Sequence, residues 1–203
     1  MNAKIRIIIS VVVGVALAAL IAFAQTRTDG TQSQSAGGII GMPLGGSFEG
    51  LLDADGKTVT EETFKDKYQL VFFGFTFCPM ICPTEMTRLG KVLDKLTPDQ
   101  RAQIAPIFVS IDPERDTPKV LKAYGTSFNP AIISLTGTQD SINKVKADWK
   151  VYASKVQMDG MTEYMMDHST FLYFRDPDGL IQGLFNREDP PETILKAINA
   201  VIK

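Results

Sequence analysis

The chain has few of the residues that usually build metal and disulfide frameworks, with two cysteines and one histidine among 203 residues. Two cysteines exclude a disulfide-dense scaffold, and one histidine excludes a site made of several imidazoles. A basic surplus is also missing, since 21 Lys and Arg stand against 23 Asp and Glu for a net charge of −2. That balance argues against a nucleic-acid-binding protein. Any site that uses a thiol or an imidazole must be built from those three residues.

Long apolar runs are also absent, except at the N-terminus. Lys4 and Arg6 precede residues 7–24, which carry no charge. A run of about 18 apolar residues reaches the lower limit of a membrane span, and the flanking charges predict that the chain after it is exported. The alternative is a cleaved signal peptide, because residues 22–24 (Ala-Phe-Ala) fit the small-x-small cleavage pattern. The run is longer than a usual signal-peptide core, which favours a retained anchor over residues 1–24.

Three regions are expected along the chain. After the anchor (1–24), residues 25–47 are polar and rich in Gly and Ser, which predicts a flexible tether or a disordered leader without a role. Residues 48–203 are expected to form the folded domain, opening with a hairpin around the turn at 53–56. Further strands are predicted at 68–73, 105–111, 132–136, 169–174 and 180–185, and helices at 84–96, 117–128, 139–149 and 190–202. This alternation predicts an α/β fold with a mixed sheet flanked by helices.

The residues that can react or bind a metal lie where a predicted buried strand ends. Cys78 and Cys82 have the spacing Cys-x3-Cys, and we expect them where the next helix begins. A helix N-terminus favours a thiolate, the form that attacks disulfides and ligates metals. Residues four apart on a helix have Cβ atoms roughly 5–6 Å apart, wider than the roughly 3.5–4.5 Å of a disulfide. The pair is therefore expected to bridge only after local adjustment, or to hold one soft ion.

A metal ion would need a third donor, and the one histidine, His168, stands just before a predicted strand. A lone histidine is more often structural than a ligand. Two thiolates with an imidazole suit copper or zinc, and soft thiolates favour Cu(I). Four charged residues also follow a strand, and we expect them to form local ion pairs and turn contacts rather than to orient a partner: Asp112, Glu114, Arg115 and Asp116.

Three separated segments together resemble the Sco/SenC family of thioredoxin-fold copper proteins. They are Phe72–Pro83 with both cysteines, Ser110–Pro118, and Asp167–Ser169, in the family's order. The resemblance covers roughly residues 48–203 and implies a thioredoxin-like sheet. It also implies that Cys78, Cys82 and His168 bind one copper ion, as Cu(I) or Cu(II). Ser169 stands where thioredoxin-like reductases carry a cis-proline, so His168 is expected to lean over the cysteines.

The family resemblance further implies delivery of copper to the dinuclear centre of cytochrome c oxidase subunit II. An upstream periplasmic copper donor or thiol reductase would be a second partner, and the N-terminal anchor would hold the protein at the bacterial inner membrane with its domain on the periplasmic side. The alternative is a thiol–disulfide oxidoreductase that uses Cys78 and Cys82 as a redox-active pair. A redox or copper sensor is a weaker third reading.

Overall fold

The structure is a computed structural model that describes residues 39–157, 160 and 162–203. These residues belong to one compact unit, Ala36–Lys203. The predicted anchor (1–24) and residues 25–38 of the predicted tether lie outside the described residues. None of the helices within the described residues is long and apolar enough to cross a membrane.

The last part of the predicted tether contacts the folded unit. The Gly41 amide donates to the Ile181 carbonyl at 2.7 Å, and the Gly45 amide donates to the Asp148 carbonyl at 3.2 Å. Pro43 forms an isolated β-bridge with Leu180. Ordered structure therefore begins before residue 48.

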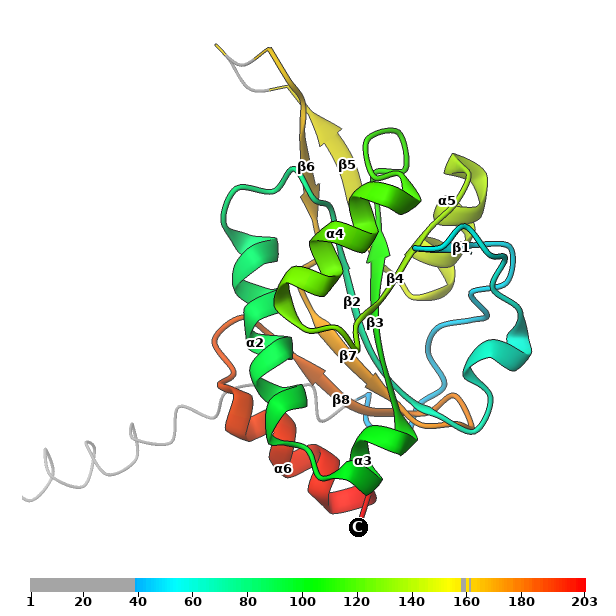
Figure 1. Cartoon of the computed structure of the whole chain (residues 1–203), viewed down its shortest axis with the longest axis vertical. Helices are drawn as coiled ribbons and strands as arrows, with labels where there is room; N and C mark the ends of the chain where they lie inside the picture. Colours follow the sequence, from blue (N-terminus) through cyan, green and yellow to red (C-terminus); the bar gives the residue numbers. More distant parts are fainter. Residues whose placement is uncertain (1–38, 158–159, 161) are drawn as a thin grey trace, which may run out of the picture. The chain divides into compact units, whose positions relative to one another are not determined.

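The centre of the unit is a six-stranded sheet (Figure 1), and its mixed character is as predicted. Its strand order is β1-β4-β3-β2-β7-β8, with β2, β3 and β4 parallel and the remaining pairs antiparallel. The strands are β1 Leu52–Asp53, β2 Tyr68–Gly74, β3 Ile104–Ser110, β4 Ile133–Thr136, β7 Leu172–Arg175 and β8 Ile181–Phe185. Six of the seven residues of β2 and all of β3 are buried, because helices cover both faces of a parallel sheet.

The helices are η1 Glu61–Phe64, α2 Ile81–Lys95, α3 Pro98–Gln103, α4 Pro118–Phe128, α5 Gln139–Asp148 and α6 Pro191–Val201. Alternation along β2 shows which of them cover each face. Phe72 contacts Phe108 of β3, which contacts Tyr124 of α4, whereas the next residue, Phe73, contacts Trp149 at the end of α5. Helix α2 packs against α4 and α6, so it lies with α4 on the Phe72 face.

The predicted N-terminal hairpin forms only in part. The Asp53 amide donates to the Lys57 carbonyl at 2.9 Å and the Val59 amide to the Leu51 carbonyl at 2.7 Å, so the chain does turn back. The returning segment makes only a single bridge, Leu52 to Thr58, and the strand β1 pairs with β4 instead. The turn was predictable from its local residues, whereas the pairing with β4 depends on the tertiary fold.

A second sheet was not predicted. β5 (Ala153–Val156) and β6 (Met165–His168) form a two-stranded antiparallel sheet, which we call the ribbon, and it extends beyond the central sheet (Figure 1). Ala153 is paired with His168 at its base. The expected strand from residue 169 is wrong at its start, because His168 ends β6 and β7 begins only at Leu172.

Candidate metal and redox site

The two cysteines lie between the end of β2 and the first turn of α2, and this helix begins earlier than predicted. Helix α2 begins at Ile81, three residues before the predicted start, and its N-cap is Met80. Pro83 falls in the first turn, where no intrahelical hydrogen bond needs its missing N–H. Cys82 is therefore in the first turn, while Cys78 precedes the helix and does not share a helical face with it.

Both cysteine side chains are buried, and they do not form a disulfide. The Cys82 amide donates to Cys78 Sγ at 3.3 Å. A hydrogen bond from the Cys82 side chain, together with nearby backbone amides, holds the pKa of the Cys78 thiol well below its ordinary value. The same contact and burial raise the pKa of Cys82. The pair therefore holds one thiolate, on Cys78, beside one protonated thiol.

The imidazole of His168 reaches this pair from the ribbon. Its Nε2 lies 3.8 Å from Cys82 Sγ, and its Nδ1 lies 2.8 Å from the Ser169 carbonyl oxygen. A carbonyl only accepts, so Nδ1 carries the proton and Nε2 presents its lone pair toward the sulfur. Burial lowers the pKa of His168, which keeps the ring neutral. Neutral imidazole with a free Nε2 is the form that binds a metal ion.

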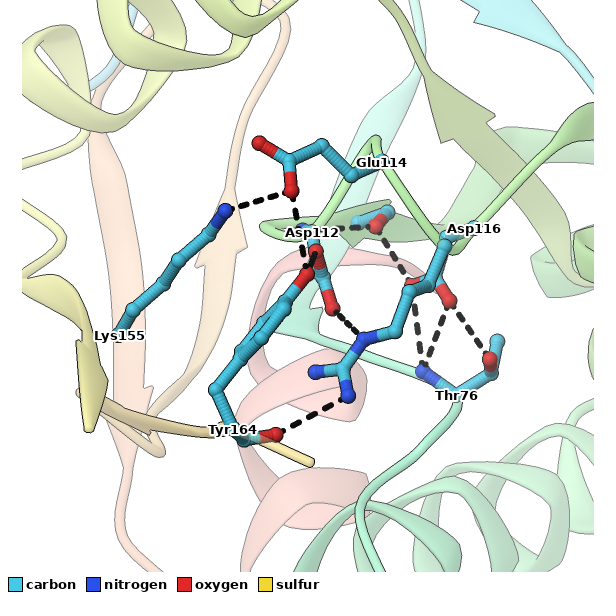
Figure 2. A network of polar contacts seen from close by, with 8 residues as sticks. Thr76, Asp112, Glu114, Asp116, Lys155 and Tyr164 are labelled. Carbon is cyan, nitrogen blue, oxygen red and sulfur yellow. Dashed lines mark hydrogen bonds and ion pairs between the residues drawn. The ribbon is translucent and has the colours of Figure 1, made fainter. Parts of the chain in front are cut away.

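A buried carboxylate, that of Asp116, holds Thr76 in the segment that leads to Cys78 (Figure 2). Asp116 accepts hydrogen bonds from the Thr76 amide at 3.1 Å, from the Thr76 hydroxyl at 2.6 Å and from the Ser110 hydroxyl at 2.6 Å. Burial raises the pKa of Asp116. The expected local turn contact is made by the Asp116 amide, which donates to the Asp112 carbonyl at 3.0 Å, whereas the carboxylate reaches Thr76 across 40 residues of sequence.

The chain also holds Cys82 through the close approach of a glycine. A Cβ placed on Gly74 would lie 2.9 Å from Cys82 Sγ and 2.9 Å from Phe108 Cε2. Gly74 was not singled out from the sequence, although a glycine at the end of a strand can signal such an approach. The sulfur of Cys82 therefore rests directly on the β2 backbone.

The side chains of Cys78, Cys82 and His168 do not converge on one point in this structure. Among residues 39–157, 160 and 162–203, no group of three or more His, Cys, Asp or Glu side chains lies close enough to hold a metal ion. Cys82 and His168 are in contact, whereas Cys78 Sγ faces the Cys82 amide. The donor types fit copper, since two sulfurs and an imidazole are soft and borderline ligands.

Sequence reasoning did not single out Tyr164 or its contacts. Its hydroxyl donates to Asp112 at 2.7 Å, across 52 residues of sequence, and its carbonyl accepts from Arg115 at 3.0 Å. No local pattern in the sequence marks such a long-range pair. The predicted ion pair of Arg115 is present, since its Nε donates to Asp112 at 2.5 Å.

A buried dithiol at the end of a central strand, on a mixed sheet with helices on both faces, defines a thioredoxin-like dithiol protein. Residues 40–203 match the SCO1/SenC family model, and the chain belongs to that family. It is 41% identical over 163 residues to the mitochondrial protein SCO2 of Saccharomyces cerevisiae, which covers 80% of this chain. The chain spans 54% of the length of that relative.

Solved structures give the same fold. The copper-bound crystal structure of yeast Sco1 superposes with a TM-score of 0.70 at 35% identity, covering 78% of this chain and 88% of that one. A second structure, of BsSco, superposes with a TM-score of 0.58 at 26% identity, covering 79% of this chain and 96% of that one. BsSco is described as a member of the Sco family of cytochrome c oxidase assembly proteins in which a disulfide switch was identified.

Proposed function

We propose that the protein is a copper metallochaperone that binds one copper ion through Cys78, Cys82 and His168. It delivers that ion to the dinuclear copper centre of cytochrome c oxidase subunit II. The observation that carries the proposal is the 3.8 Å approach of His168 Nε2 to Cys82 Sγ, between segments 86 residues apart. The copper bound by yeast Sco1 and the oxidase-assembly role of BsSco's family support the choice of metal and acceptor.

Binding requires one local change. Cys78 turns its sulfur from the Cys82 amide toward His168, so that copper lies among two sulfurs and Nε2. A site of such low coordination number leaves room for the thiolates and imidazoles of an acceptor, and transfer proceeds by ligand exchange. The domain works on the periplasmic side of a bacterial inner membrane, anchored through residues 1–24 and supplied by an upstream copper donor.

Copper titration of the full-length chain tests this function. The reduced wild type is expected to bind one ion per chain and to show a thiolate-to-Cu(II) absorption band, whereas the disulfide form binds none. Cys78→Ala, Cys82→Ala and His168→Ala are each expected to weaken binding strongly. Asp167→Ala is the matched control, since it changes the exposed neighbour of the histidine and keeps the ring. Copper affinity unchanged in His168→Ala would overturn the ligand assignment.

A second function is favoured by the unequal thiols, namely thiol–disulfide exchange. The Cys78 thiolate attacks a substrate disulfide and forms a mixed disulfide, which releases one substrate thiol. Cys82 then loses its proton and attacks Cys78 Sγ, which releases the second thiol and leaves a Cys78–Cys82 disulfide. The substrate gains the two electrons that the pair loses, and an upstream thiol reductase restores the pair.

The pH dependence of alkylation tests this asymmetry. Because the pKa of Cys78 is lowered, its reaction with iodoacetamide in the copper-free protein should persist well below the pH where an ordinary thiol stops reacting. In Cys82→Ala the main cause of the lowering is gone, so the midpoint should move upward toward the ordinary value of about 8.5. Mass spectrometry of the labelled peptide measures both rates, and identical profiles would contradict the assignment.

A further inference from the structure

The strand that carries His168 has a second attachment to the domain. Tyr164 immediately precedes β6 and lies four residues before His168. Side chains alternate along an extended strand, so residues four apart point to the same side. The contacts agree, since His168 reaches Cys82 and Tyr164 reaches Asp112. The ribbon is thus held against the domain at both ends of β6.

Tyr164 is held through its hydroxyl and its carbonyl (Figure 2). Its hydroxyl donates to Asp112 Oδ1 at 2.7 Å, and its carbonyl accepts from Arg115 Nη1 at 3.0 Å. Arg115 Nε also donates to Asp112 Oδ2 at 2.5 Å, which closes the triangle. Asp112 is 1% exposed, so water cannot readily replace the lost partner if Tyr164 leaves. Hydrogen bonds to such an ionised group are among the stronger ones.

The guanidinium of Arg115 connects this triangle to the cysteine loop. It lies 3.7 Å from the centre of the Tyr164 ring and 4.6 Å from that of Phe77, the residue before Cys78. Phe75 lies 5.9 Å from the same guanidinium, and its ring stands edge-on to the His168 ring at 5.8 Å. The Arg115 guanidinium therefore contacts both Tyr164, which precedes the strand of His168, and Phe77, which precedes Cys78.

We propose that Asp112, Arg115 and Tyr164 form a clamp that holds β6 where His168 reaches Cys82. Tyr164 is thus a positioning residue for copper retention, and this inference rests on the proposed copper-binding function. A neighbouring ion pair between the ribbon and the same loop, Lys155 with Glu114, joins two exposed side chains, and such pairs contribute little. The triangle, which is centred on the buried Asp112, is the stronger polar attachment of the two.

The variant Tyr164→Phe tests the clamp, because it removes one hydroxyl and keeps the ring. In the copper-free full-length chain, amide hydrogen exchange of Met165 to His168 should become several-fold faster. In the Cu(I)-loaded chain, copper transfer to an excess of a Cu(I) chelator should become roughly tenfold faster, the scale set by one hydrogen bond to a charged group. Unchanged exchange and unchanged transfer would overturn the clamp.

Two further variants calibrate the result. Tyr152→Phe makes the same chemical change on the opposite side of the ribbon, where the hydroxyl contacts Ser154 Oγ at 2.8 Å within the ribbon. It should leave both rates unchanged. Arg115→Lys keeps the charge but loses the planar stacking on Tyr164 and Phe77, so it should shift both rates in the direction of Tyr164→Phe.

A double-mutant cycle separates positioning from general loosening. In a His168→Ala background, Tyr164→Phe should cause no further acceleration of copper transfer, because the clamp acts through the imidazole. An equal acceleration in both backgrounds would assign Tyr164 a merely structural role. If His168→Ala itself leaves copper transfer unchanged, the proposed function fails. A wild-type rate in Tyr164→Phe with transfer still dependent on His168 overturns the clamp alone.

Discussion

The sulfur side and the imidazole side of the site rest on different kinds of structure. Cys82 is fully buried against Gly74 of β2. The loop before Cys78 is fixed by Asp116, which accepts from the Thr76 amide and hydroxyl of that loop and from the Ser110 hydroxyl of β3. His168 instead ends a two-stranded ribbon outside the six-stranded sheet, and its ring is only half-buried. The sulfurs therefore belong to the core, whereas the imidazole belongs to an appendage.

This difference bears on how a bound ion can be exchanged. Moving the Cys82 sulfur, which packs against Gly74, disturbs a close-packed interior that resists even small displacements. Moving the ribbon opens its polar contacts and the partly buried packing of Ala153, Met165 and Met166 against the core, but it leaves the central sheet intact. Such elements open at lower free energy than the core. On the proposed function, an acceptor ligand enters as His168 withdraws, while the sulfurs keep the ion.

The largest effect is expected when the support of the sulfur side is removed. Asp116→Ala leaves the Thr76 amide, the Thr76 hydroxyl and the Ser110 hydroxyl without their buried partner. The free energy of unfolding should fall by about 3 kcal/mol, as measured by urea denaturation of the copper-free, reduced protein. Asp55→Ala is the control, because Asp55 pairs with Lys122 on the exposed surface, and it should change stability little. Equal effects would show that Asp116 gives the sulfur side no more support than an exposed ion pair gives.

A smaller effect is expected when the sulfur is pushed off the strand. Gly74→Ala places a Cβ 2.9 Å from both Cys82 Sγ and Phe108 Cε2, so the packing must shift. Overpacking of this kind should cost about 2 kcal/mol of unfolding free energy. In a Cys82→Ala background the cost should shrink, because one of the two clashing atoms is gone. Full tolerance of Gly74→Ala in the wild type would show that the sulfur is free to move.

The sequence was most informative where one segment determines its own structure. The helix α4 begins at Pro118 and ends at Phe128, close to the prediction of 117–128, because Thr117 caps it through the Val120 amide and Pro118 suits the first turn. The buried strands β2 and β3 were predictable from continuous apolar runs. The short helix α3 was missed, although Thr97 and Gln100 form a capping box that marks its start.

The imidazole side of the site was less predictable than the sulfur side. β5 (Ala153–Val156) and β6 (Met165–His168) show no clear alternation of apolar and polar residues, since the ribbon has no fully buried face. The clamp pairs Tyr164 with Asp112 only through the tertiary fold. The cysteines were found by spacing, and the proximity of His168 to Cys82 matches what the family resemblance implied. Its role as a ligand stays a prediction.

The smallest effect on stability is expected from the imidazole side. His168→Ala removes a half-buried ring that packs edge-on against Phe72 and Phe75 and makes polar contacts with Cys82 Sγ and the Ser169 carbonyl. Because the ring ends a ribbon outside the central sheet, unfolding free energy near neutral pH should change by less than about 1 kcal/mol. Urea denaturation of the copper-free, reduced protein measures this, and a loss above about 2 kcal/mol would place His168 with the core.

The same variant has a pH signature whose sign follows from burial. The pKa of His168 is lowered in the folded protein, whereas in the unfolded chain it returns to about 6.5. Below that pH the unfolded state binds more protons, so His168 makes the wild type lose stability as the pH falls. The raised pKa values of Glu85 and Asp116 act in the opposite direction, but both groups are present in both proteins and largely cancel in the difference. As the pH falls from about 7.5 to about 5.5, the free energy of unfolding of the wild type should therefore decrease relative to that of His168→Ala. A difference that is independent of pH would mean that the imidazole is as well solvated in the folded state as in the unfolded chain, which would contradict a ring turned inward toward Cys82.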